Sequence, residues 1–390
     1  MIKIEDKDKC CGCSACMNAC PQKCIVMVKD SEGFLYPKVN LDLCINCEMC
    51  EKVCVYYKGE ARRVNELSTF AALSIDNQLR EQSSSGGLFS IFAMQILDDN
   101  GIVYGVAMND DCRNCSFIRV DNKDLLYKLR GSKYFQAEVG NIYRQVKKDL
   151  IDGKKVLFSG VPCQITALKL FLNKDYDCLF TVEIICHGVP SQALWNKYVN
   201  YLEERYEARI NKVNFRNKKN GWHEFGLKKE GDNINQYLSF HKDPFMIMFL
   251  KNYCLRPSCY SCRAKMIGSM SDLTIADFWG IENVAPEMDD DLGTSLLIIQ
   301  SSKGKKMLDD NIGRMRLKEV SFSDGIKSNP SYNSSVIKPN EREVFFIDMN
   351  NMTFRELTSK YCKKTSIFKR GMFFLKRLVK SIFCVSKTTK

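Results

Sequence analysis

The sequence predicts a fold of two parts, a small α+β module at the N-terminus and an α/β domain with a mixed or largely parallel sheet. The module is indicated by two cysteine runs of identical spacing within the first sixty residues. The domain is indicated by short apolar segments that alternate with helical patterns from about residue 68 onward. With 390 residues the chain can bury a sizeable core.

The two cysteine runs predict two [4Fe–4S] clusters. The first run has the spacing C-x2-C-x2-C-x3-C before Pro21, and the second repeats it with Val55 in place of the proline. In two-cluster ferredoxins the fourth cysteine of each run binds the other cluster. We therefore expect one cluster on Cys10, Cys13, Cys16 and Cys54, and the second on Cys44, Cys47, Cys50 and Cys20. This ferredoxin-type domain spans residues 1–60. Cys11 and Cys24 fall outside its frame, and we expect buried or spare thiols there in preference to ligands.

The remaining elements follow in chain order. A hairpin with its turn near Gly33 is expected between the two cysteine runs. Strands are then expected at 68–75, 101–108, 155–159 and 180–185, and helices at 87–97, 139–151, 165–172 and 191–206. Ser191 is the expected N-cap of the last helix. Short strands and loops follow, then a strand at 295–301, and we assign residues 65–335 to the α/β domain.

Composition indicates a reducing compartment. Twenty cysteines in a long chain whose first residues are charged do not fit the short, disulfide-rich secreted proteins. No run approaches the roughly 18 apolar residues of a membrane-spanning helix. We therefore expect a cytoplasmic protein without export.

The positive charge is concentrated at the C-terminal end, residues 350–390. From Asn351 onward eleven Lys or Arg face one acid, Glu356, so this tail carries +10 of the net +12. A nucleic-acid groove on the globular part is therefore not expected. Five apolar residues of the tail share one helical face, namely Phe368, Met372, Leu375, Val379 and Ile382. Such a basic amphipathic helix suits an anionic membrane surface, here the inner face, or an acidic partner; it could equally dock on the protein's own core.

Four further cysteines predict a third metal site. The strands at 155–159 and 180–185 run into Cys163 and Cys186, and the carboxyl ends of strands line the ligand crevice of α/β sheets. Cys259 and Cys262 form a C-x2-C pair that needs two more thiolates, with Cys254 as a substitute. The sequence leaves a cluster, a zinc site and ordinary buried cysteines open. His187 beside Cys186 is a candidate proton donor, or a residue that orders the loop.

Two loops of small residues predict an anion site. The residues Ser83 to Gly87 lie between an expected strand and helix, where backbone amides and a helix N-terminus favour a phosphate or pyrophosphate. Gly131 to Tyr134 form a second such loop, with a lysine. Alone, each loop is also compatible with a plain turn that caps a helix.

Taken in order, these motifs resemble a known family. The two cysteine runs, SSSGG, GSKY, GVPCQ, CHGVPS, FRNKKNGW, RPSCYSC and SDLTIADFWG cover roughly residues 5–305. The set is similar to the coenzyme F420 hydrogenase/dehydrogenase beta-subunit family, in its bacterial form with an N-terminal ferredoxin module. The resemblance implies FAD near Ser84, Ser85, Gly86, Gly87, Ser132, Lys133, Tyr134, Pro162, Gln164 and Asp277. It also implies a [4Fe–4S] cluster on Cys163, Cys186, Cys259 and Cys262.

The sequence thus predicts an iron–sulfur flavoprotein oxidoreductase. Electrons would pass between [4Fe–4S] clusters, FAD and a substrate or hydride carrier that the sequence does not identify, with a small molecule or a redox partner protein at the far end. The alternative is a non-catalytic electron-transfer subunit of a larger redox complex.

Overall fold

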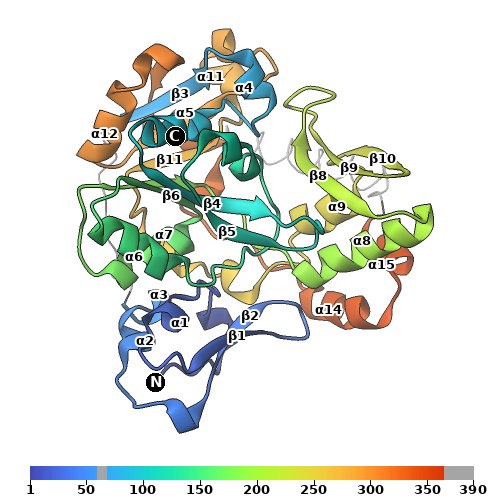
Figure 1. Cartoon of the computed structure of the whole chain (residues 1–390). Helices are drawn as coiled ribbons and strands as arrows, with labels where there is room; N and C mark the ends of the chain where they lie inside the picture. Colours follow the sequence, from blue (N-terminus) through green and yellow to red (C-terminus); the bar gives the residue numbers. More distant parts are fainter. Residues whose placement is uncertain (59–67, 364–390) are drawn as a thin grey trace, which may run out of the picture.

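The computed structural model describes residues 1–58 and 68–363, and Figure 1 shows the module at the N-terminus beside the α/β domain. The module contains a hairpin of β1 (Ile25–Lys29) and β2 (Leu35–Val39). Three short helices accompany it: α1 (Ala15–Ala19), α2 (Met49–Lys52) and α3 (Val55–Lys58). The hairpin turns at Gly33, as expected, because its backbone has a φ of 86° that glycine adopts without strain.

An eight-stranded mixed sheet forms the centre of the domain, which confirms the predicted fold class. Its strand order is β13-β3-β12-β11-β7-β6-β4-β5. The bounds are β3 (Ser68–Ser74), β4 (Ile102–Met108), β5 (Cys115–Val120), β6 (Val156–Gly160), β7 (Leu179–Ile184), β11 (Leu273–Asp277), β12 (Ser295–Ile299) and β13 (Met315–Val320). Strands β4, β6, β7 and β11 are parallel, and the pairs toward both edges are antiparallel.

Helices cover both faces of this sheet. Because side chains alternate along a strand, Ile102 and Phe158 face one layer while Val103 and Leu157 face the other. The first layer contains α6 (Ile142–Ile151) and α7 (Pro162–Leu172), and the second contains α5 (Leu88–Asp98) and α12 (Ser302–Asp309). Helix α7 begins three residues earlier than expected, because Pro162 is well suited to the first position of a helix.

A three-stranded antiparallel sheet and several helices complete the domain. The sheet contains β8 (Ile210–Asn217), β9 (Gly226–Gly231) and β10 (Ile234–Ser239). The remaining helices are α4 (Asn77–Glu81), α8 (Gln192–Tyr206), α9 (Pro244–Leu250), α10 (Arg263–Ile267), α11 (Ile281–Val284), α13 (Phe322–Lys327), α14 (Arg342–Asn351) and α15 (Phe354–Tyr361). Ser191 caps α8 as expected, since its hydroxyl accepts a hydrogen bond from the amide of Leu194.

The C-terminal end of the described chain packs into the structure. Phe345 and Phe346 of α14 and Leu357 of α15 belong to the largest hydrophobic core. The five apolar residues of the predicted amphipathic helix, at 368–382, lie outside the described residues. Within residues 1–58 and 68–363, none of the helices is long and apolar enough to cross a membrane.

The N-terminal module is docked on the domain through buried contacts. Helices α1 and α3 pack against α7, and α14 lies beside the hairpin (Figure 1). Arg342 of α14 forms a bidentate ion pair with Glu32 in the hairpin turn, at 3.0 and 2.6 Å. Arg144 of α6 donates to the carbonyls of Asn18 and Cys20, at 2.6 and 2.7 Å. These contacts hold the cysteine runs at a fixed place on the domain.

We expect Gly33→Ala to weaken this docking. A Cβ at Gly33 would lie 2.7 Å from the Cβ of Ala193 and 2.8 Å from its backbone nitrogen, and the φ of 86° is unfavourable for alanine. Backbone strain and overpacking together should destabilise the protein by about 2 kcal/mol or more. Gly313→Ala is the matched control, because no atom lies within 4 Å of its added Cβ. Thermal unfolding of both variants tests this; equal midpoints would contradict it.

Candidate metal centres and cofactor site

One predicted set of cysteines lines a pocket inside the N-terminal module. The pocket has about 330 Å³ of empty space, and Cys20, Cys44, Cys47 and Cys50 all line it. This is the crossed set, three cysteines from the second run and the last from the first. Cys24, expected as a spare thiol, also lines the pocket, with its Sγ 3.4 Å from that of Cys20.

The other crossed set gathers where the first cysteine loop meets α3. Burial, with Cys10 and Cys54 nearby, raises the pKa of the Cys16 thiol. Burial likewise raises the pKa of Cys54 to about 11. Cys13 lies beside Cys16 and contacts Cys11. The structure therefore brings the members of each predicted set into one neighbourhood.

A second, larger pocket lies between the module and the domain. It has about 510 Å³ of empty space and is lined by Cys163, Cys186, Cys259 and Cys262, the four cysteines predicted for a third metal site. They come from four places: the N-terminus of α7, the loop after β7, the 3-10 turn Pro257–Cys259 and the N-cap of α10. We call this the inner pocket. Cys254, the expected substitute, is fully buried but does not line it.

Cys11 is a fifth cysteine of the inner pocket, and sequence reasoning missed it. Its side chain lines the pocket and contacts the thiols of Cys13 and Cys163. The only signal in the sequence was its position inside the first cysteine loop, between Cys10 and Cys13. Cys11 thus stands between one predicted cluster of the module and the inner pocket.

Two buried hydroxyls of the inner pocket have no hydrogen-bond partner among the described residues. They are the phenol of Tyr56 and the hydroxyl of Ser258. A buried hydroxyl without a partner is costly, so such a pair indicates a group that accepts hydrogen bonds there. Arg256 and Lys265 add positive charge to the same walls. The pocket thus combines thiols, unpaired donors and cations.

No three side chains of the types Cys, His, Asp or Glu converge on a single-ion site anywhere in residues 1–58 and 68–363. The thiols of the inner pocket are spread over its walls instead. His187 is on the same walls, with its Nε2 2.7 Å from Oδ1 of Asn252 and its ring edge against Phe249. Burial lowers the pKa of His187, so the neutral ring is favoured.

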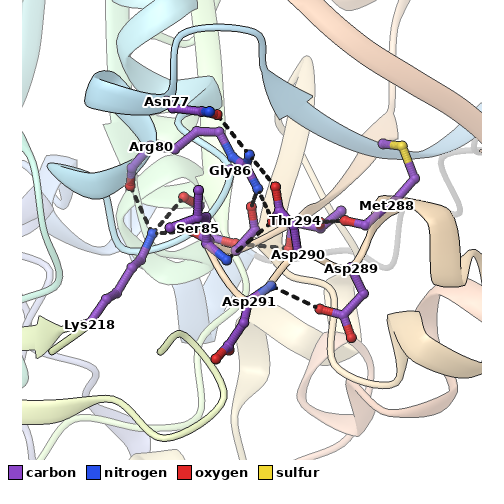
Figure 2. A network of polar contacts seen from close by, with 12 residues as sticks. Asn77, Arg80, Ser85, Gly86, Lys218, Met288, Asp289, Asp290, Asp291 and Thr294 are labelled. Atoms are coloured by element: carbon purple, nitrogen blue, oxygen red, sulfur yellow. Dashed lines mark hydrogen bonds and ion pairs between the residues drawn. The ribbon is translucent and has the colours of Figure 1, made fainter. Parts of the chain in front are cut away.

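Hydrogen bonds from neighbouring segments hold the predicted anion loop, residues 83–87, in position (Figure 2). Ser85 donates to the carbonyl of Thr294 at 2.9 Å, and the amide of Gly86 donates to the hydroxyl of Ser295 at 3.0 Å. Lys218 donates to the carbonyls of Arg80, Ser85 and Leu292, at 2.8, 3.1 and 2.6 Å. A Cβ at Gly86 would lie 2.6 Å from the carbonyl oxygen of Ala72, so only glycine fits there.

The two small-residue loops meet at their serines. The hydroxyls of Ser84 and Ser132 are 3.0 Å apart, and the amide of Ser132 also donates to Ser84. Next to them α5 begins at Gly87, which has a φ of 88° and provides no side-chain cap for the first amides of the helix. An uncapped helix N-terminus beside two hydroxyls is suited to an anion.

Most of the other residues that were expected to bind FAD have side chains that contact neighbouring parts of the protein. Lys133 donates to the carbonyls of residues 128–130, at 3.2, 3.2 and 2.8 Å. The side-chain oxygen of Gln164 accepts from the amide of Val161 and so caps α7, while Pro162 lines the inner pocket. Tyr134 packs edge-on against Phe215. These side chains serve the fold around the two sites.

Asp277 belongs to a buried ion pair that the sequence did not reveal. Its carboxylate accepts two hydrogen bonds from Arg216, at 2.6 and 2.9 Å, and one from the indole of Trp222 at 2.9 Å. Arg216 also lies over the ring of Phe225 and is 3.4 Å from the carbonyl of Ser84. Its Nε has no partner among the described residues. The motif FRNKKNGW, which contains Arg216, Lys218 and Trp222, was the available signal.

Two segments of the chain match models of known protein families. Residues 9–57 match the model of the 4Fe–4S dicluster domain. Residues 153–324 match the model for the C terminus of the coenzyme F420 hydrogenase/dehydrogenase beta subunit. This segment contains the four predicted cysteines of the inner pocket and Asp277. The loops at 83–87 and 131–134 lie outside both matched segments.

Three proteins of Methanocaldococcus jannaschii are similar to parts of this chain. The coenzyme F420-dependent sulfite reductase is 23% identical over 190 residues, which are 48% of this chain and 29% of that protein. An uncharacterized protein is 23% identical over 212 residues, 45% of this chain and 56% of its own length. An uncharacterized ferredoxin is 35% identical over 51 residues, 13% of this chain and 65% of its own length. The chain thus matches less than two thirds of each relative.

A solved structure is also similar to the chain. It is a chain of the F420-reducing [NiFe] hydrogenase complex from Methanosarcina barkeri, with 14% sequence identity and a TM-score of 0.46. The match covers 77% of this chain and 94% of that chain. The chain thus combines a segment similar to a 4Fe–4S dicluster domain with a segment similar to the C terminus of the coenzyme F420 hydrogenase/dehydrogenase beta subunit.

A buried carboxyl group near the inner pocket gives a pH-dependent expectation. Burial raises the pKa of Glu183 to about 7, although hydroxyls of Ser269 and Thr274 face it. The folded protein therefore keeps the proton while the unfolded chain, with a pKa of 4.5, has lost it. Stability from this group is full below pH 4.5 and is lost as the pH rises to about 7.

We expect Glu183→Gln to remove the loss of folding stability that accompanies the rise in pH from 4.5 to about 7. At pH 8 the variant should be more stable than the unchanged protein by up to about 3 kcal/mol, and at pH 5 the difference should be much smaller. Thermal unfolding midpoints at the two pH values measure this. A difference that does not depend on pH would contradict the raised pKa.

Proposed function

We propose that this protein is an iron–sulfur flavoprotein oxidoreductase that passes electrons between [4Fe–4S] clusters, FAD and a substrate or hydride carrier. The observation that carries the proposal is the inner pocket. Four cysteines from four separate segments line it, directly against the dicluster module. Four thiols that converge on one pocket from separate segments of the α/β domain fit a bound metal group, whereas structural cysteines usually pack singly as small apolar residues.

In the module the crossed sets hold the two clusters, one on Cys10, Cys13, Cys16 and Cys54 and one on Cys20, Cys44, Cys47 and Cys50. The inner pocket holds a third cluster on Cys163, Cys186, Cys259 and Cys262. A cluster is favoured over zinc because the thiols do not converge on a single-ion position. The unpaired hydroxyls of Tyr56 and Ser258 fit a cluster, since its sulfurs accept hydrogen bonds.

The FAD pyrophosphate binds where the two serine loops meet. The hydroxyls of Ser84 and Ser132 and the uncapped N-terminus of α5 fit an anion, and the unpaired Nε of Arg216 lies close by. When bound, FAD would supply the conversion between single-electron and hydride transfer. Lys218 and Ser85 hold the loop in position, and Gly86 permits its close approach to β3. His187 is the candidate proton donor, at the wall of the inner pocket.

The far end of the electron path is a redox partner protein or a small molecule. The sulfite reductase relative is described as dependent on coenzyme F420, and a hydride carrier of that kind is the first compound to test here. A hydride carries two electrons, so FAD at the serine loops and clusters that accept single electrons form a consistent path. The basic tail remains a proposed contact for an anionic membrane or an acidic partner.

Anaerobic purification with iron, sulfide and flavin quantified tests the proposal. We expect about twelve irons and about one FAD per chain, and a flavin spectrum that bleaches with a reductant. The double variant Ser84→Ala/Ser132→Ala should weaken FAD binding at least about tenfold, because each hydroxyl gives a hydrogen bond to a charged group. Ser83→Ala is the matched control, since that hydroxyl bonds the carbonyl of Leu79 within α4. Full iron without flavin would instead establish the electron-transfer subunit.

A further inference from the structure

Arg256 is a fully buried cation whose hydrogen-bond acceptors are all neutral. Its Nε donates to the carbonyl of Cys10 at 2.7 Å, and its two terminal nitrogens donate to Oε1 of Gln136 and the carbonyl of Leu35, both at 2.9 Å. The guanidinium also lies over the ring of Tyr36, 4.3 Å from its centre. Its side chain has 0% exposure. Among residues 1–58 and 68–363, no carboxylate forms an ion pair with it.

This arrangement is costly unless a negative charge lies nearby. Transferring a guanidinium out of water carries a large penalty, and neutral carbonyls recover only part of it. The other buried arginines of the described residues follow the usual rule. Arg80 is paired with Asp290, Arg216 with Asp277 and Arg342 with Glu32. Arg256 is therefore the exception that needs an explanation.

The position of Arg256 identifies the missing negative charge. On one side its guanidinium packs on Gly12, in the loop that carries Cys10 and Cys13; a Cβ there would lie 2.8 Å from Nη1. On the other side Arg256 lines the inner pocket, one helical turn before Cys259, whose amide donates to the Arg256 carbonyl at 2.9 Å. Arg256 thus lies between two proposed cluster sites. A cluster bound by four thiolates is anionic and becomes more so on reduction.

We propose that Arg256 is the shared counter-cation of the inner cluster and of the module cluster on Cys10, Cys13, Cys16 and Cys54, and that it raises the reduction potentials of both. The inference rests on the proposed function, because it requires a cluster in the inner pocket. A fixed positive charge favours the reduced, more negative form of a cluster, and burial of the pair strengthens this effect. Arg256 is a positioning and tuning residue, and it contacts no substrate.

Three variants separate charge from packing. Arg256→Gln removes the charge, and Arg256→Lys keeps the charge but loses the forked hydrogen bonds. The matched control is the double variant Arg342→Gln/Glu32→Gln. Arg342 is also buried and joins the domain to the hairpin, yet its charge is neutralised by Glu32, so the double variant loosens the same interface without changing the net charge. All are prepared as the full chain with clusters reconstituted.

Redox titration followed by electron paramagnetic resonance measures the potential of each cluster. We expect Arg256→Gln to shift the equilibrium constant for reduction of two clusters at least about tenfold toward the oxidised form, equal to about 59 mV for one electron. Arg256→Lys and the control should shift it less than about threefold. The cluster on Cys20, Cys44, Cys47 and Cys50 should change little in every variant.

Three results would overturn the inference. They are unchanged potentials in Arg256→Gln with full iron, equal shifts in the Gln and Lys variants, and loss of iron from both of these variants. Iron lost only from Arg256→Gln would support the inference, because charge is then what retains the clusters. The iron content of the unchanged protein tests the proposed function independently of Arg256. About eight iron atoms per chain would mean that the inner pocket holds no cluster, and this would contradict the proposed function.

Discussion

Replacing Cys163 with alanine is expected to lower the iron content from about twelve to about eight atoms per chain, with a matching loss of sulfide. Cys163 lines the inner pocket at the N-terminus of α7, together with the other three predicted ligands and Cys11. A [4Fe–4S] cluster with three remaining thiolates is labile, so the whole cluster should be lost rather than one iron. Chemical analysis of iron and sulfide under anaerobic conditions measures the loss.

Cys254→Ala is the matched control for this experiment. Cys254 is fully buried, with 0% exposure, but it does not line the inner pocket. Its variant should keep about twelve irons, although the cavity lowers stability. Cys11→Ala adds a second comparison, because Cys11 is the fifth thiol of the pocket. Iron lost from Cys11→Ala and kept in Cys163→Ala would assign the fourth ligand to Cys11 and contradict our ligand set.

Asp277→Asn is expected to destabilise the protein by about 3 to 5 kcal/mol. The substitution leaves the guanidinium of Arg216 buried without its carboxylate, and Arg216 has only 4% of its side chain exposed. It also weakens the hydrogen bond from Trp222. The midpoint of urea unfolding, followed by tryptophan fluorescence, measures the change.

Glu287→Gln is the control for Asp277. Glu287 pairs with Lys318 at 2.6 Å, but both side chains are more than 40% exposed, at 49% and 42%. The variant should change stability by less than about 1 kcal/mol, as exposed ion pairs usually do. If Asp277→Asn kept full stability and instead lost bound FAD, the carboxylate would be a cofactor contact and not a structural partner of Arg216.

The parts of this structure that follow from local sequence were predictable. Cysteine spacing alone predicted the crossed sets, because a short loop can place its thiols around a cluster only at certain intervals. The inner pocket was predictable for a second reason. Cys163 and Cys186 both follow buried strands, and parallel strands deliver such residues to the same edge of a sheet.

The parts that depend on which long side chain reaches which partner were not predictable. Lys133 lies in a loop that was predicted to bind an anion, but its flexible side chain donates hydrogen bonds to three backbone carbonyls. Asp277 was predicted to contact the cofactor, but in the structure it forms an ion pair with Arg216, which belongs to another sheet. Strands β5, β11 and β13 were also missed, and the strand predicted at 295–301 is not the final one, because β13 follows it. Each is short, and Cys115–Val120 is recognisable only by its pairing with β4.

The docking of the N-terminal module has a consequence for how the protein is made. The first cysteine loop bonds to Arg256, 246 positions further along the chain, and Glu32 bonds to Arg342, 310 positions further along. A ribosome adds about 5 to 20 residues per second, so the latter contact must wait roughly 15 to 60 seconds after Glu32 has been added. During translation the module and its thiols therefore emerge well before the surface that shields them exists. For that interval the cysteines of the module lack the contacts that cover them in the folded protein.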